Sequence, residues 1–238
     1  MFTDQENFRF PRILDFLLDK KKLFRIFVVV NVHTFRIYNL IQIMPTNIYR
    51  EKLLNAVLFF AQKTKHANMT KISKLLYFLD FTHFKQTGYP SIGLDYFAFK
   101  NGPVPKKLWL ELKDGVVPSD FKGKLSLVLK KDESDPNFKE IEFFTKAKPD
   151  LSVFSPREKQ ILDDLVFMFK DVRAREISEI SHLVNQPWDV TKREKGENAS
   201  IDYMLAIDKE AAVSHDEAES SLKDHREIIK NFSLEPVQ

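Results

Sequence analysis

The 238-residue sequence contains no cysteine and only 6 glycines. The absence of cysteine excludes disulfide bonds, thiolate nucleophiles, iron–sulfur clusters and cysteine-ligated zinc. It fits a reducing compartment, and we predict a cytoplasmic protein. The apolar run at 23–32 contains Arg25 and is shorter than the roughly 20 residues that a membrane-spanning helix needs. We therefore expect no membrane association.

The scarcity of glycine also limits the chemistry that the chain can carry out. The six glycines are scattered, and neither a GxxxxGK[ST] phosphate loop nor a GxGxxG dinucleotide fingerprint occurs. A GxSxG nucleophile elbow and an HExxH zinc helix are missing as well. We accordingly predict a protein that is not an enzyme, with no catalytic residues, no cofactor and no metal ligands.

The remaining composition is that of a folded protein, with 43% hydrophobic and 30% charged residues. The net charge of +3 is confined to residues 1–43, which hold 7 basic and 4 acidic residues and 7 of the 22 phenylalanines. Residues 44–238 hold 30 residues of each sign. We interpret 1–43 as a mis-annotated or disordered extension and Met44 as the start of the folded domain, 44–238.

The patterning after Met44 predicts a single α+β domain, mostly helical, with a small antiparallel β-sheet or hairpin. Apolar stripes predict helices at 46–65 and 71–86, the second capped by Thr70 and ended by Gly88 and Pro90. Ser155 with Glu158, and Ser214 with Glu217, have the spacing of capping boxes at helix starts. The other expected elements are strands at 96–100, 125–130 and 140–145, an extended segment at 103–105, helices at 105–114 and 174–183, a charged loop at 192–198 and a surface helix at 214–231.

Few polar side chains are spaced for chemistry. Asp80 and His83 lie three residues apart on one predicted helix, where Asp80 could orient His83 as a base or the two could simply sit at the edge of a buried face. His215, Asp216 and His225 project from different faces of a helix and do not make a metal site. Lysines mixed with aromatic residues near Gly102 can bind single-stranded nucleic acid, but acidic residues are interleaved with them.

Several of these stretches together resemble one known family. They are Lys74–Phe81, Lys100-Asn-Gly-Pro-Val-Pro105 before a helix with Trp109, Ala174-x-Glu176-Ile177, and Ser181-His182 followed by Pro187-Trp188. In combination they resemble the Panacea domain of SocA-like, phage-associated antitoxins over about 48–207. The resemblance implies a prokaryotic toxin–antitoxin protein that neutralises a cognate toxin by direct binding. It further implies a role as a proteolytic adaptor that delivers the toxin to a Clp-type protease.

The resemblance also indicates which residues contact the partner. The expected contact residues are Tyr96, Lys100, Gly102, Pro103, Pro105, Trp109, His182 and Trp188. Each group also has a purely structural interpretation. The first five residues would then form a turn that packs the sheet on a helix, and Trp109 would belong to the core. His182 and Trp188 would form a buried pair in which the histidine bonds a backbone carbonyl.

Two other functions compete with toxin binding. A phage-associated nucleic-acid-binding regulator would need a basic face, which the neutral composition of 44–238 does not promise. We therefore do not expect nucleic acid as a partner. A hydrolase or transferase would need a pocket that gathers Asp80, His83 and His182.

Overall fold

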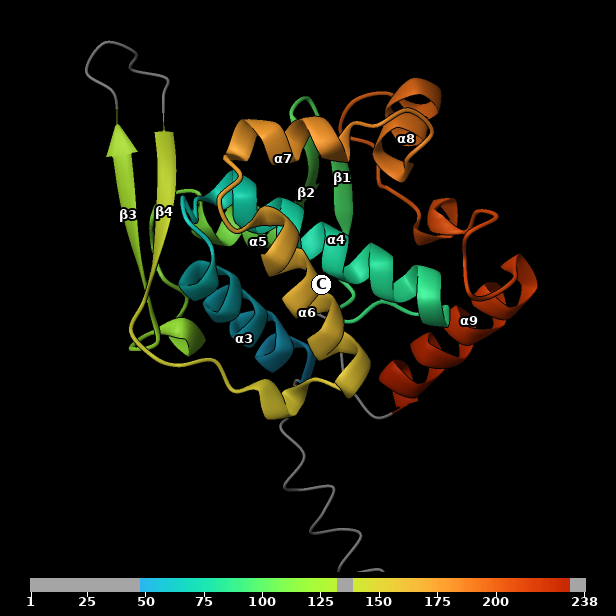
Figure 1. Cartoon of the computed structure of the whole chain (residues 1–238), viewed down its shortest axis with the longest axis horizontal. Helices are drawn as coiled ribbons and strands as arrows, with labels where there is room; N and C mark the ends of the chain where they lie inside the picture. The colour runs from blue at the N-terminus through green and yellow to red at the C-terminus, as the bar shows by residue number, and fades with distance from the viewer. Residues whose placement is uncertain (1–47, 132–138, 232–238) are drawn as a thin grey trace, which may run out of the picture. The chain divides into compact units, whose positions relative to one another are not determined.

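The computed structural model describes residues 48–131 and 139–231, which contain seven α-helices and two separate two-stranded antiparallel sheets (Figure 1). The prediction of a mostly helical α+β fold is confirmed, with two small sheets where the sequence analysis expected one. The interpreted extension, 1–43, and the polar connection at 132–137 lie outside the described residues.

Helix α4 (Met69–Thr87) lies at the centre of the fold. Helices α3 (Ile48–Lys63), α6 (Pro156–Phe169) and α7 (Ala174–Ser181) pack against it (Figure 1). Neighbouring elements cover most of the circumference of α4, so several of its polar residues are buried together with its apolar ones. The buried polar side chains of α4 are Lys71, Ser73, Lys74, Asp80 and His83.

The ends of α4 show why it begins and stops where it does. The Asn68 side chain accepts a hydrogen bond of 2.9 Å from the Lys71 backbone nitrogen and caps the helix. The predicted cap at Thr70 is therefore wrong, because the helix starts one residue before it. Gly88 adopts a φ of +80° and ends the helix as predicted, since a left-handed residue there suits glycine.

The first hairpin joins β1 (Tyr96–Phe99) to β2 (Gly102–Pro105), with Tyr96 opposite Pro105 and Phe99 opposite Gly102. Segment 198–201 covers the other edge of β1, where the Ala98 nitrogen donates to the Ala199 carbonyl at 2.9 Å. Strand β2 contains two prolines, which an edge strand tolerates, and it packs against α4. Helix α5 (Lys106–Leu112) follows directly.

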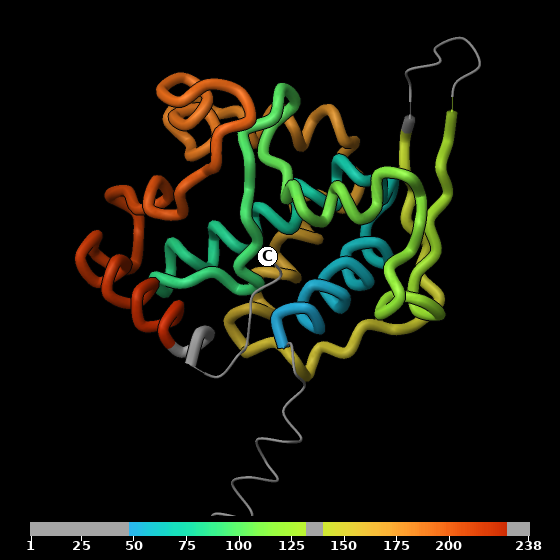
Figure 2. Tube along the Cα trace, turned by 180° about the vertical axis from the view of Figure 1, so that it is seen from behind, coloured from blue at the N-terminus to red at the C-terminus, as the bar shows by residue number. Residues whose placement is uncertain are grey.

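The second hairpin joins β3 (Leu125–Lys131) to β4 (Lys139–Thr145) and matches the predicted strands. It is attached to the helical body where the Phe143 nitrogen donates to the Ala67 carbonyl at 2.9 Å. Figures 1 and 2 show this hairpin at the edge of the domain opposite to the C-terminal helix.

The C-terminal third is more helical than predicted. Helix α8 (Pro187–Lys195) occupies most of the expected charged loop at 192–198. Pro187 at the first helical position and the ion pair of Asp189 with Arg193 one turn later support the helix, so its charges mark a solvent face. A 3₁₀ turn, Tyr203–Ala206, precedes helix α9 (His215–Asn231).

Both predicted capping boxes are present. Ser155 and Glu158 exchange the two hydrogen bonds at the start of α6, and Ser214 and Glu217 do so before α9. Helix α9 lies at the surface and buries only Ala218 and Leu222 among the side chains that the structure describes. Within the described ranges, every helix is too short or too polar to cross a membrane.

Candidate interaction site

The turn between β1 and β2 contains a glycine that has no room for a side chain. Gly102 has a φ of +104°, a conformation that residues with a Cβ rarely adopt. A Cβ on Gly102 would lie 2.7 Å from Lys74 Cε and 2.8 Å from both Lys74 Nζ and His182 Nε2. The backbone of the turn is therefore in direct contact with α4 and with the end of α7.

Lys74 brings an amine into the interior directly beneath this turn. Its side chain is 1% exposed, and Nζ donates a hydrogen bond of 2.9 Å to the Pro103 carbonyl. Burial lowers the pKa of Lys74 to about 7, because the ammonium form loses its hydration. None of the carboxylates in the described ranges forms an ion pair with Lys74. The amine therefore has no local counter-ion.

His182 and Trp188 fix the end of α7 to the hairpin. Their rings stack with centroids 3.9 Å apart and an interplanar angle of 18°. Trp188 is buried, and its Nε1 donates a hydrogen bond of 3.0 Å to the Phe99 carbonyl. Burial and the nearby charge of Lys74 lower the pKa of His182, and the backbone of Asn101 opposes this shift. His182 Nε2 has no hydrogen-bond partner among the described residues.

Exposed apolar side chains flank His182, which contacts this turn. Leu183 and Val184, in the connection from α7 to α8, are 57% and 75% exposed, and Ile180 is 40% exposed. Lys100 and Asn101 form the exposed tip of the β1–β2 turn, which lies between α7 and α8 (Figure 1). We call these five residues, Lys100, Asn101, Ile180, Leu183 and Val184, the turn surface. The turn surface combines exposed apolar side chains with a turn that Lys74 and His182 contact from below.

A groove adjoins the turn surface on the α5 side. It has a volume of about 620 Å³ and runs between the N-terminal turns of α4, the hairpin, α5 and the start of β4. Phe99 and Trp109 line it, with ring centroids 6.0 Å apart in an edge-to-face arrangement. Lys74, Lys100 and Lys113 also line it. We call this feature the hairpin groove.

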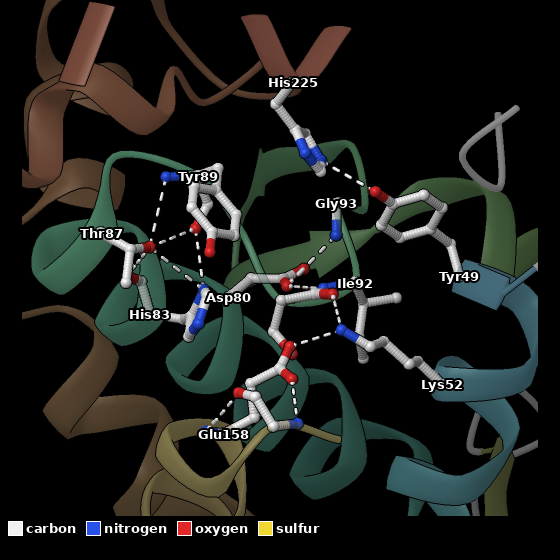
Figure 3. A network of polar contacts seen from close by, with 12 residues as sticks. Tyr49, Lys52, Asp80, His83, Thr87, Tyr89, Ile92, Gly93, Glu158 and His225 are labelled. Carbon is white, nitrogen blue, oxygen red and sulfur yellow. Dashed lines mark hydrogen bonds and ion pairs between the residues drawn. The ribbon is translucent and has the colours of Figure 1, made fainter. Parts of the chain in front are cut away.

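Asp80 is completely buried and organises the loop that leads into β1 (Figure 3). Its carboxylate accepts hydrogen bonds from the backbone nitrogens of Ile92, Gly93 and Leu94 and from the hydroxyls of two tyrosines, Tyr96 and Tyr203. Burial raises the pKa of Asp80, and these five donors oppose the rise by stabilising the ionised form. Asp80 therefore anchors the loop and β1.

The helix surface beyond Asp80 carries a second polar network. His83 Nδ1 donates to the Tyr89 carbonyl at 2.9 Å, so Asp80 does not orient His83 as a base. His225 of α9 stacks on Tyr89 with centroids 5.3 Å apart and hydrogen-bonds the Tyr49 hydroxyl at 3.3 Å (Figure 3). The network connects α9 to α3 and to the loop after α4.

A partly buried ion pair lies below this network (Figure 3). Lys52 Nζ is 2.6 Å from Glu158 Oε1, which also accepts a hydrogen bond of 2.6 Å from the Ser91 hydroxyl. Burial tends to raise the pKa of Glu158, but Lys52 and the other donors hold it below its ordinary value. The pair joins α3 to the start of α6, so its role is structural.

A hydrolase or transferase site was expected to gather Asp80, His83 and His182 in one pocket. Neither Asp80, His83 nor His182 lines the hairpin groove or the two cavities beside α9. Groups of three or more histidine and carboxylate side chains that could hold a metal ion do not occur in residues 48–131 and 139–231.

The eight residues expected to contact a partner lie in one region but differ in exposure. Lys100 is exposed at the turn, and Trp109 and His182 are partly buried. The other five, Tyr96, Gly102, Pro103, Pro105 and Trp188, are buried. They support the turn surface from below, while contact with a partner stays a prediction.

Sequence reasoning overlooked Lys74 as a site residue, although it lies inside the recognised helix motif. A partial signal was available, because Lys74 lies on a helix whose apolar residues occupy more than one face, which favours burial of its neighbours. Leu183 and Val184 were also overlooked. Their exposure depends on the turn after α7, which apolar periodicity does not reveal.

The comparisons with known proteins give one match. The family model described as antitoxin SocA-like, Panacea domain, matches residues 72–189, a shorter range than the expected 48–207. This range includes Lys74, Gly102, His182 and Trp188. Neither a curated protein nor a solved structure matches the chain. Residues 72–189, which form the centre of the fold and carry the supported turn, belong to the antitoxin SocA-like Panacea domain family.

Proposed function

We propose that the protein is an antitoxin that neutralises a cognate toxin by binding it directly through the turn surface. Membership of an antitoxin family supports the partner class. The exposed apolar side chains of Leu183 and Val184, next to a turn held by Lys74 and His182, support the location. Neighbouring apolar side chains exposed on a surface are typical of protein–protein interaction sites.

The exposure of Leu183 and Val184 is the observation that carries this location. Large apolar side chains at 57% and 75% exposure stay in water in the free protein, and a partner that covers them gains about 25 cal/mol for each Å² of apolar surface removed from water. The proposed role is binding, and it requires no catalytic group.

The test is co-expression with small reading frames that neighbour the gene. A frame that is toxic alone and harmless with this chain identifies the toxin, and a pull-down then tests direct binding. Val184→Glu places a charge in the proposed interface and should abolish rescue and reduce binding at least about 10-fold. Val116→Glu is the matched control, because Val116 is 64% exposed and lies outside the turn surface. Equal loss in both variants, or rescue by Val184→Glu, would contradict the proposed location.

Delivery of the toxin to a Clp-type protease is a further part of the proposal and rests on the family resemblance. The toxin should then have a shorter half-life with the antitoxin present, and deletion of the protease should restore its level. Unchanged toxin turnover would mean that the protein neutralises the toxin by binding alone.

The competing regulator hypothesis predicts binding to DNA that weakens steeply with added salt.

A further inference from the structure

Three lysines line the hairpin groove, and one of them, Lys100, also belongs to the turn surface. Lys100 lies exposed at the turn, and Lys113 lies with Nζ 5.7 Å from the Trp109 ring centroid. Lys74 lines the same groove from a position that is almost completely buried. Three amines from α4, the β1–β2 turn and the end of α5 therefore border one cavity.

Two carboxylates also line the groove, and neither neutralises Lys74. Glu140 Oε1 accepts a hydrogen bond of 2.5 Å from the Asn68 side-chain amide. Asp114 is exposed just after the C-terminal end of α5, next to Lys113. The pKa of Lys74 is set by burial without an opposing contribution from either carboxylate. Lys74 is thus a buried amine without an anion, beside an open groove.

We propose that the hairpin groove binds an acidic segment of the toxin, with one carboxylate acting as the counter-ion of Lys74. This inference rests on the proposed function and names the chemistry of the partner. The aromatic rings of Phe99 and Trp109 supply apolar contact for the segment, and Lys100 and Lys113 supply further positive charge at the rim. Desolvated opposite charges across an interface favour the correct partner over others.

A polypeptide carboxylate fits the groove better than a nucleic acid. Residues 44–238 hold 30 basic and 30 acidic residues, whereas a nucleic-acid surface needs a continuous basic face. Glu140 and Asp114 would repel a chain of phosphates along the same groove. A single carboxylate can instead approach the lysines while avoiding these two acidic groups.

Proton uptake is the signature that distinguishes this binding mode. Free Lys74 has a pKa of about 7 and is mostly neutral at about pH 8. An opposite charge within about 4–6 Å favours the ammonium form, so binding the carboxylate should draw a proton from solution. The affinity should accordingly fall as the pH rises above 7, and binding to the full chain should show a heat that depends on the ionisation enthalpy of the buffer.

The experiment uses the full chain and two short capped peptides, one of alternating glutamate and glycine and one with glutamine in place of glutamate. Calorimetry at about pH 8 in two buffers should show binding of the glutamate peptide with uptake of up to one proton, and at least about 10-fold weaker binding of the glutamine peptide. In NMR of ¹³C-labelled lysine, the Lys74 resonance should titrate near pH 7 alone and above about pH 8 with the glutamate peptide.

Variants separate the roles of the amines. Lys74→Met should abolish proton uptake, and Lys113→Gln should weaken binding while leaving proton uptake in place. Lys122→Gln, which changes an exposed lysine that does not line the groove, is the control. The two-buffer measurement on the unmodified chain provides a test that needs no substitution.

Three outcomes would overturn the inference. They are equal binding of both peptides, binding of the glutamate peptide without proton uptake, and tighter binding of inorganic phosphate or a single-stranded oligonucleotide than of the glutamate peptide. The assay contains no toxin, so it fails independently of the proposed function. If the protein rescues cells but does not bind the glutamate peptide, toxin neutralisation stands and only the inference about an acidic segment fails.

Discussion

Lys74 and His182 meet at the single backbone position of the β1–β2 turn where a side chain would collide with both. Lys74 Nζ and His182 Nε2 each lie 2.8 Å from the place that a Cβ of residue 102 would occupy. The glycine of the Gly-Pro-Val-Pro motif is therefore needed for close approach as well as for its positive φ. Helix α4, the end of α7 and the hairpin turn make contact through that position.

Gly102→Ala should destabilise the protein by about 2–4 kcal/mol. The substitution adds strain at a φ of +104° and inserts a methyl group within 3 Å of two side chains. Urea denaturation followed by circular dichroism measures the change. Gly123→Ala is the matched control, because Gly123 has a φ of +77° and no heavy atom within 4 Å of its Cβ position. It should cost only about 1 kcal/mol. Equal costs at both positions would show that contact with Lys74 and His182 is unimportant.

The stability of the protein should increase between about pH 7 and pH 10 because of Lys74. Its pKa is about 7 in the folded state and 10.5 as the ordinary value, so the unfolded chain binds more protons within this range. The free energy of unfolding then rises with pH, by at most about 1.4 kcal/mol per pH unit from this group. The rise ends near pH 10, where tyrosines of the unfolded chain begin to ionise.

Lys74→Met isolates this contribution. The variant should be more stable than the unmodified chain near pH 7, and the difference should shrink as the pH approaches 10. Urea midpoints at several pH values measure it. Parallel pH profiles for the two proteins would mean that Lys74 keeps its ordinary pKa in the fold.

The sequence predicted those features of the fold that depend on local signals. Helix α6 was located by its capping box, and α4 by an apolar pattern that ends at Gly88. Helix α8 was missed because its charged residues form a solvent face that resembles a loop. The β1–β2 pairing was also missed, because two prolines conceal a strand whose remaining backbone groups still pair with β1.

The sequence named Gly102 and the pair of His182 and Trp188 as separate groups of expected contact residues, and their role in binding stays a prediction. The structure adds that these groups share one packed junction. Whether each is buried or exposed depends on contacts between segments far apart in the sequence, such as Trp188 with the Phe99 carbonyl, 89 residues away. A single sequence does not encode such pairings in any local pattern.

Asp80→Asn should destabilise the protein by about 2–4 kcal/mol. The amide offers one acceptor oxygen where the carboxylate receives five hydrogen bonds, and its NH₂ group faces buried donors. Loss of loop order before β1 should increase proteolysis near residues 91–95. Asp95→Asn is the control, since Asp95 is exposed in the same loop. Unchanged stability in Asp80→Asn would mean that the loop is held by its apolar residues alone.

Mild acid should loosen α9 before it unfolds the rest of the domain. Burial lowers the pKa of His225, and the positive charges of Lys52, His83 and Arg226 lower it further. Tyr49 and Tyr89 contact its ring, and Glu158 lies with Lys52 below them. The folded state thus binds fewer protons than the unfolded state below about pH 6.5, so docking of α9 weakens as the pH falls through that value.

Hydrogen exchange at about pH 5 and pH 7 measures this change, after correction for the intrinsic pH dependence of exchange. Amides of α9 should lose protection at the lower pH, while those of α4 keep it. His225→Gln removes the titrating group from the contact with Tyr49 and Tyr89, so it should reduce the difference between the two pH values. His215→Gln changes an exposed histidine on the same helix and should leave the difference intact. If His225→Gln retains the full acid response, the proton that loosens α9 binds elsewhere, with His83 as the next candidate because its pKa is also lowered by burial.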